Sequence, residues 1–65
     1  MIDNETKKEL EWLEQTINFN IDILIPKREA AVNGIKHNYR YIIKKLEVAL
    51  EAVHKAQDKI KEMEK

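Results

Sequence analysis

The sequence predicts an all-α fold: a two-helix hairpin whose copies assemble into a homo-oligomeric helical bundle or coiled coil. Only one Gly and one Pro occur in 65 residues, which are too few turn residues for an all-β fold. A hydrophobic content of 43% is too high for a disordered tail. Apolar residues recur at spacings of three and four through most of the chain, which indicates amphipathic helices. Residues 1–65 are therefore predicted to form a single helical domain.

The first helix is predicted over about residues 4–20. Asp3 or Asn4 is suited to cap it, and Glu5 follows in the first turn, where the helix dipole favours an acid. One apolar stripe runs along this helix and beyond it: Leu10, Leu13, Ile17, Ile21 and Leu24. A second apolar set falls on the opposite side: Trp12, Phe19 and Ile23. A helix that is apolar on two faces must be covered from both sides.

A turn is predicted over about residues 21–26, and Pro26 sets its boundary. Proline has no amide hydrogen, disfavours the α conformation at Ile25, and is best placed in the first turn of a helix. The first helix is expected to end between Asn18 and Leu24, and Asp22 is then available to cap the second helix.

The second helix is predicted over about residues 27–64, from a heptad pattern that runs for more than four repeats. The a positions are Val32, Tyr39, Leu46, Val53 and Ile60, and the d positions are Ile35, Ile42, Ala49, Ala56 and Met63. Ile43 and Leu50 add apolar e positions. Asn33-Gly34 is the weak point. Because the spacing crosses it unchanged, a continuous or kinked helix is favoured over a short helix 27–33 followed by a separate one.

The two predicted lengths require self-association. A second helix of about 38 residues spans ~57 Å, whereas a first helix of about 20 residues spans ~30 Å. In a hairpin, the seam from about Leu50 to Met63 and one face of the first helix would stay uncovered. Cysteine is absent, so no disulfide stabilises this short chain, and a second copy supplies the missing helix.

Charge is segregated along a chain whose formal net charge is zero. Residues 26–45 contain six basic residues and one acid, whereas residues 1–25 contain six acids and two lysines. These stretches are complementary, which favours their antiparallel packing within or between chains. The longest uncharged apolar run is Ile23-Leu24-Ile25, and the start of the chain has no signal-peptide core, so a cytoplasmic protein without a membrane partner is expected. The abundance of Lys, Ile and Asn is typical of an AT-rich genome, such as that of a low-GC bacterium or its phage.

A basic face early in the second helix is the candidate ligand site. It consists of Lys36, His37, Arg40, Tyr41, Lys44 and Lys45. Arg supplies a bidentate fork for phosphate, Lys a point charge and Tyr a stacking plane, so a nucleotide or nucleic acid is one ligand class. The alternative interpretation is a solvated face that pairs with the acidic first helix of the same or a neighbouring chain.

No residues suggest catalysis. The chain has no Cys and no Ser, and Gly34, its single glycine, cannot form a phosphate-cradling loop by itself. An enzyme and a cofactor are therefore not expected. Glu51 and His54 match the Glu-x-x-His spacing of di-metal bundles, but they occupy f and b positions away from the seam, so no metal site is predicted.

The leading hypothesis is a small non-catalytic interaction protein, a regulator or inhibitor that acts by binding through its homo-oligomeric bundle. Its expected partners are a second copy of itself and another protein. The predicted interface residues are Trp12, Phe19, Tyr39, Leu46, Leu50, Val53, Ile60 and Met63. The alternatives are an oligomeric binder of a phosphate-bearing ligand and a structural coiled-coil subunit.

Overall fold

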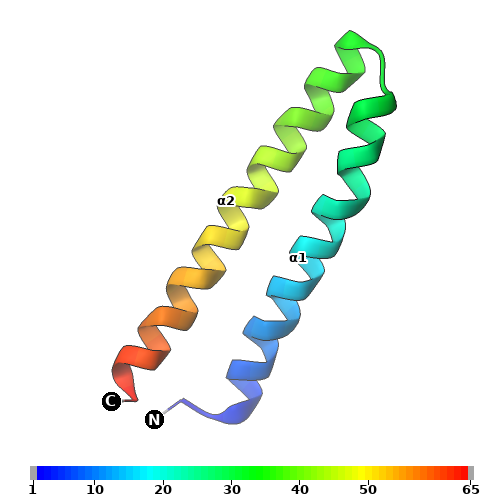
Figure 1. Ribbon diagram of the computed structural model, residues 1–65. Helices are drawn as coiled ribbons and strands as arrows, with labels where there is room; N and C mark the ends of the chain where they lie inside the picture. The colour runs from blue at the N-terminus through cyan, green and yellow to red at the C-terminus, as the bar shows by residue number, and fades with distance from the viewer. Residues whose placement is uncertain (1, 65) are drawn as a thin grey trace.

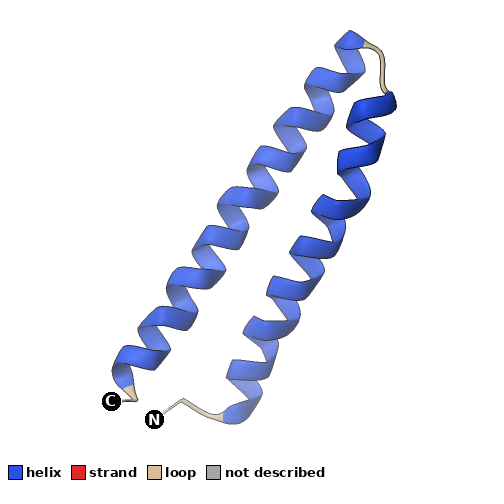
Figure 2. Ribbon diagram, in the orientation of Figure 1, coloured by secondary structure: helices blue, strands red, loops and turns tan. Residues whose placement is uncertain are grey.

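Two antiparallel α-helices of similar length make up the part of the chain that the structure describes (Figures 1 and 2). The computed structural model describes residues 2–64, with α1 at Asn4–Ala30 and α2 at Asn33–Met63. Within these residues there is no strand, and the predicted all-α hairpin is confirmed. The hairpin is a rod of 49 × 15 × 11 Å with a radius of gyration of 15.1 Å. A compact chain of this length would have a radius of gyration of about 11 Å.

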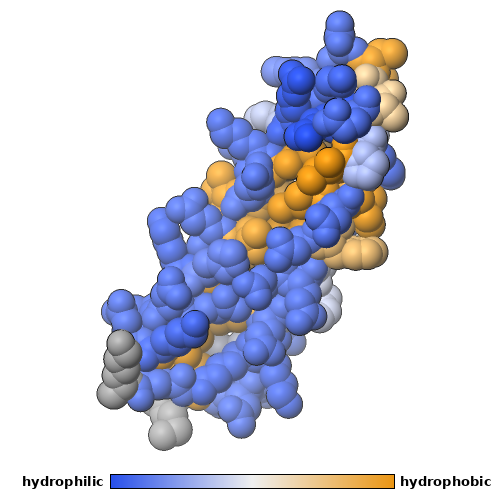
Figure 3. All heavy atoms as spheres, viewed as in Figure 1, coloured by the Kyte–Doolittle hydropathy of each residue, from blue (hydrophilic) through white to orange (hydrophobic). Residues whose placement is uncertain are grey.

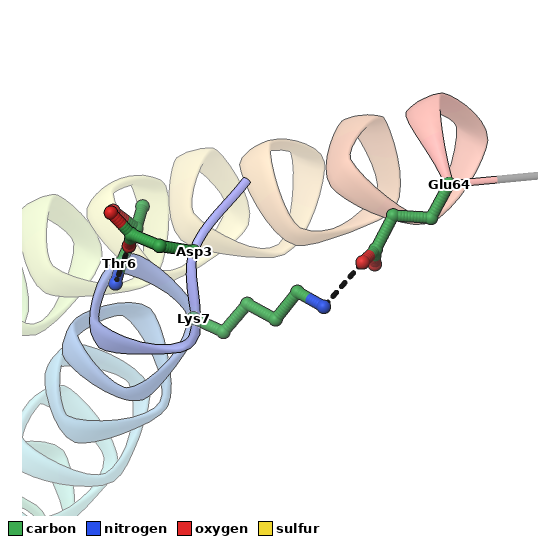
Figure 4. A network of polar contacts seen from close by, with 4 residues as sticks. All are labelled: Asp3, Thr6, Lys7 and Glu64. Atoms are coloured by element: carbon green, nitrogen blue, oxygen red, sulfur yellow. Dashed lines mark hydrogen bonds and ion pairs between the residues drawn. The ribbon is translucent and has the colours of Figure 1, made fainter. Parts of the chain in front are cut away.

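Asp3 caps the N-terminus of α1 (Figure 4). Its backbone is extended, and its Oδ1 accepts a hydrogen bond of 2.8 Å from the Thr6 amide. That hydrogen bond, together with one from the Thr6 side chain, lowers the pKa of the Asp3 carboxyl. Glu5 lies in the first turn, and Lys27 and Arg28 lie in the last turn, so both ends complement the helix dipole.

Helix α1 continues through Pro26 to Ala30, so the prediction that it ends near residue 20 is wrong. Proline removes one intrahelical hydrogen bond and crowds the preceding turn. Against that cost, Ile21, Leu24 and Arg28 continue the spacing of the half-buried residues that face α2. The burial gained over these last turns explains why the helix is kept rather than broken.

The chain reverses at Ala31 and Val32, both of which have extended backbone. The Ala31 amide donates to the Arg28 carbonyl at 3.3 Å, and the Val32 carbonyl accepts from the Lys36 amide at 2.7 Å. The predicted turn at about 21–26 and a helix continuous across Asn33-Gly34 are therefore both wrong. Val32 and Ile35 fit the heptad pattern of α2, but they are 70% and 53% exposed. They are therefore not packed in the seam, and their fit to the pattern does not require a helix that continues through residues 31 and 32.

The helices meet along a narrow seam of half-buried side chains. The seam residues that face each other include Leu10, Glu14, Ile17, Ile21, Leu24 and Arg28 on α1 and Tyr39, Ile43, Leu46, Leu50, Val53, Gln57 and Ile60 on α2, all half-buried except Ile43. Helix α2 thus faces α1 with its a and e positions, and its d positions lie on one flank. Among the described residues only Ile43 is buried, at 4% exposure. The hairpin has a seam, but it has almost no core.

The seam runs the whole length of both helices, which have 27 and 31 residues. Near the free ends, Lys7 pairs with Glu64 (Figure 4), and Glu14 pairs with the His54 ring at 2.7 Å. The predicted mismatch between a short and a long helix is therefore wrong, because continuation through Pro26 lengthens α1. Within the described residues, neither helix has a stretch of the length and hydropathy needed to cross a membrane.

Candidate interaction surfaces

An outer aromatic face, formed by Trp12, Phe19 and Ile23, lies on the side of α1 turned away from α2. These side chains are 59%, 64% and 39% exposed, respectively. Their spacing of seven and four residues places them about half a turn from the seam residues Ile17 and Ile21. The sequence predicted a second apolar side of this helix, and the hairpin leaves it uncovered.

A second surface is the d strip of α2, formed by Ile35, Ile42, Ala49, Ala56 and Met63, of which Ala56 is half-buried and the other four are exposed. Ile42 and Met63 are 45% and 56% exposed, although Ile42 adjoins the buried Ile43. Two antiparallel helices have opposite chain directions. Residues that lie on the same rotational side of the seam, each counted along its own helix, are therefore on the same flank of the hairpin. Leu13, at 38% exposure, therefore lies on the same flank as the d strip, whereas Glu14 and His54 meet on the opposite flank.

Five of the predicted interface residues lie in the seam of the hairpin itself. Tyr39, Leu46, Leu50, Val53 and Ile60 are half-buried against α1. The other three, Trp12, Phe19 and Met63, are exposed. The sequence could not separate the two groups, because a seam within one chain and an interface between chains use the same residue types.

The basic face lies on the exposed side of α2 near the turn. Lys36 is half-buried, and the other five residues are exposed: His37, Arg40, Tyr41, Lys44 and Lys45. The Lys45 ammonium nitrogen lies 5.3 Å from the centre of the Tyr41 ring, within cation–π range. Within residues 2–64, none of the six side chains forms an ion pair. Their predicted pairing with the acidic first helix of the same chain does not occur.

The position of the turn explains why the basic face does not pair with the acidic start of α1. The hairpin places residues 36–45 beside the last turns of α1, where Lys27 and Arg28 lie, and not beside the acidic start of the chain. All six basic residues of segment 26–45 therefore gather at the turn end, with a net charge of +5 after Glu29 is counted. Segments 1–25 and 46–65 carry the compensating −5. The rod is electrically asymmetric along its length.

An open hollow of about 400 Å³ lies between the helices toward the chain termini, and Figure 3 shows it within a largely hydrophilic surface. It is lined by Lys7, Leu10, Glu11, Glu14, Gln57, Ile60, Lys61 and Glu64. The seam is polar here because Glu14 and Gln57 take positions that an apolar residue would fill. Nearer the turn, the same view shows a hydrophobic surface over both helices.

His54 belongs to a contact between the helices that sequence reasoning missed. Its Nε2 lies 2.7 Å from Glu14 Oε2, while Glu51 pairs with Lys55 within α2 at 3.5 Å. The Glu-x-x-His spacing therefore does not bring its two members to one site. Glu14 could have been found from its place between Leu10 and Ile17 in the apolar stripe, which predicts that it faces α2.

Comparison of the chain with protein-family models, with curated proteins and with solved structures finds no match in any of the three.

Proposed function

We propose that this chain is a small non-catalytic interaction protein that acts by binding, as a homo-oligomeric helical bundle. The observation that carries the proposal is the near absence of a core: a single buried side chain, Ile43, among the described residues. Two-helix hairpins of this kind need further burial to be stable, and chains below about 70–80 residues rarely gain it alone.

The exposed apolar surfaces supply what a bundle would bury. The outer aromatic face offers Trp12 and Phe19, and the d strip offers Ile42 and Met63, each more than 40% exposed. Large exposed apolar residues scattered singly are ordinary, but aligned along a helix they are typical of interfaces. A bundle formed by two or more copies would cover part of this apolar surface with the same residue types that form the seam.

Molar mass measured by light scattering over about two decades of concentration tests the proposal. We expect a multiple of the 7.7 kDa chain mass. A monomeric mass throughout, with helical circular dichroism and cooperative unfolding, would contradict it.

Trp12→Ala tests the outer aromatic face. We expect weaker binding of a second protein, because the indole is the largest exposed apolar group on α1. Val48→Ala is the matched control, because Val48 is 57% exposed and belongs to neither surface. If Trp12→Ala leaves that binding at the wild-type value, Trp12 is an ordinary surface residue.

The second candidate function is binding of a phosphate-bearing ligand through the basic face, favoured by five exposed side chains without an ion-pair partner among residues 2–64. Titration calorimetry with ATP and with pyrophosphate as probes tests it. Arg40→Ala is expected to weaken binding about tenfold or more, since a charged hydrogen bond contributes about 1.5–3 kcal/mol. Lys55→Ala is the control outside the basic face. Equal affinities for wild type and Arg40→Ala would remove this function.

A further inference from the structure

We propose that two copies pair through the flank that carries the d strip, as a two-fold symmetric dimer with their turns at opposite ends. This inference rests on the proposed function and specifies its partner, a second copy of this chain, and the geometry of the contact. Three features of the hairpin support it: the surface it leaves uncovered, the distribution of charge along the rod, and the order of side-chain sizes in the d strip.

The uncovered surface matches the area that a dimer requires. The chain has an accessible surface of 5313 Å². A compact monomer of the same mass would have about 4,300 Å², from the scaling of surface with mass. The excess of about 1,000 Å² per chain is close to the ~800 Å² that each partner contributes to a standard interface. One further face of this size must be covered for the chain to reach the burial of an ordinary small protein.

The charge distribution selects the relative direction of the two copies. Two hairpins stacked face to face can have their turns at the same end or at opposite ends, since both arrangements have two-fold symmetry. With turns at the same end, the two segments 26–45 lie together, and each carries +5. With turns at opposite ends, each basic half lies over the acidic half of the other copy. Only the second arrangement brings unlike net charges together, and the resulting attraction is screened over a Debye length of about 8–10 Å.

The order of residues in the d strip fits the same arrangement. With turns at opposite ends, α2 packs antiparallel on α2 of the other copy. If the axis passes beside Ala49, the middle residue of the strip, then Ile42 lies opposite Ala56 of the partner subunit. Ile42 thus meets a small side chain, and Ala49 at the axis lets the two α2 helices approach closely, while Ile35 lies opposite Met63 of the partner subunit at each end of the contact.

The outer aromatic face stays on the outside of this dimer. Trp12 and Phe19 point away from α2, about a quarter turn or more from the paired flank. The basic face also remains open, because Arg40 and Lys44 lie on the outer side of α2. Both surfaces are therefore doubled by symmetry and stay available to another molecule.

Spin-label distances in the intact chain test the orientation. Since cysteine is absent, Asn33→Cys gives one label per copy, beside the turn. Turns at opposite ends predict a label separation approaching the 49 Å length of the hairpin. Turns at the same end predict a separation within about 20 Å, two interhelical spacings. A short distance in a protein with dimeric mass would overturn this inference and leave the proposed function standing, whereas a monomeric mass would overturn both.

Cross-linking tests the face and the register. Ala49→Cys, placed beside the two-fold axis, is expected to oxidise to a disulfide-linked dimer, since its Cα atoms then lie within disulfide range. Val48→Cys is the matched control, exposed on the neighbouring residue but on the outer side of α2. Circular dichroism of the reduced variants checks that both are folded. If Val48→Cys cross-links as readily as Ala49→Cys, or if neither does while the mass is dimeric, the proposed face is wrong.

Discussion

Asp3 holds the first turn of α1 through its carboxylate, which accepts from the Thr6 amide. Because hydrogen bonds from Thr6 hold the pKa of the Asp3 carboxyl below its ordinary range, folding favours the ionised form. The stabilisation is therefore fully present above the unfolded pKa and is lost as the pH falls through the lower folded value. Acidification into this range should fray the start of α1 before the rest of the hairpin.

Hydrogen exchange of the Thr6 amide, followed by NMR between neutral and acidic pH, checks this prediction. Protection at Thr6 should fall as Asp3 is protonated, while amides in the middle of α1 keep theirs. Asp3→Asn retains a side-chain acceptor without a titrating group, so its Thr6 amide should show no such step. The same step in both proteins would mean that a different group is responsible.

Gln57 places a polar amide in the seam, beside the hollow near the termini. Gln57→Leu should stabilise the hairpin by about 1 kcal/mol, since it adds apolar area where the side chain is already half-buried. The measurement is the urea midpoint at one fixed protein concentration, because association shifts apparent stability. Gln15→Leu, at an exposed position of α1, should change the midpoint little. A destabilised Gln57→Leu would show that the amide makes a contact that the hairpin needs.

Gly34 shows that the turn does not depend on glycine. It lies in the first turn of α2, its φ is not positive, and a Cβ added there would meet nothing within 4 Å. Gly34→Ala should therefore stabilise α2 by about 0.5–1 kcal/mol, mainly by lowering the entropy of the unfolded chain. Thermal unfolding of this variant beside Ala52→Gly, which makes the reverse change at an exposed helical position, measures the effect. A lower midpoint for Gly34→Ala would contradict the helical conformation of this residue.

The ends of the elements were predicted unequally well, for a physical reason. The cap at Asp3 depends on residues within one turn of each other, and the sequence contains all the information needed. At Pro26 two effects oppose each other. The proline locally favours the end of the helix, whereas the burial of Leu24 and Arg28 against α2 favours its continuation. That burial depends on where the chain reverses, which local spacing cannot supply.

The sequence also does not determine which side of α2 faces α1, because two sides are apolar. Ile42 and Ile43 are adjacent and equally apolar, and a rotation of α2 about its axis by about 100° would put one in the place of the other. The structure chooses the side with Ile43 and Leu50, which offers more bulk to the seam than the alanine at position 49. Of the surface sets, the outer aromatic face and the basic face follow from helical spacing alone. The Glu14–His54 contact does not, because it requires the register between the helices.

The folded molecule is a rod with a basic end and an acidic end, although the net charge of the sequence is zero. A net charge of zero predicts no long-range attraction or repulsion between copies. The chain reversal at Ala31 and Val32, however, places the basic segment 26–45 at one end of the rod. Within one hairpin this arrangement is repulsive, since Lys27 and Arg28 lie beside the segment with Arg40 and Lys44. A second copy in the opposite direction relieves the repulsion without any change in the helices.

The salt dependence of assembly follows from this asymmetry. For copies with turns at opposite ends, raising NaCl from about 0.05 to 0.5 M should weaken dimerisation roughly three- to tenfold, because screening removes the attraction between unlike halves. Sedimentation equilibrium at each ionic strength measures the dissociation constant. Lys44→Glu and Lys55→Glu are a matched pair, since both replace an exposed lysine on α2 and change the charge equally. The first lowers the charge of the basic half and should weaken the dimer, whereas the second makes the other half more acidic and should strengthen it. Equal shifts in the two variants, or a dimer strengthened by salt, would show that charge does not orient the copies.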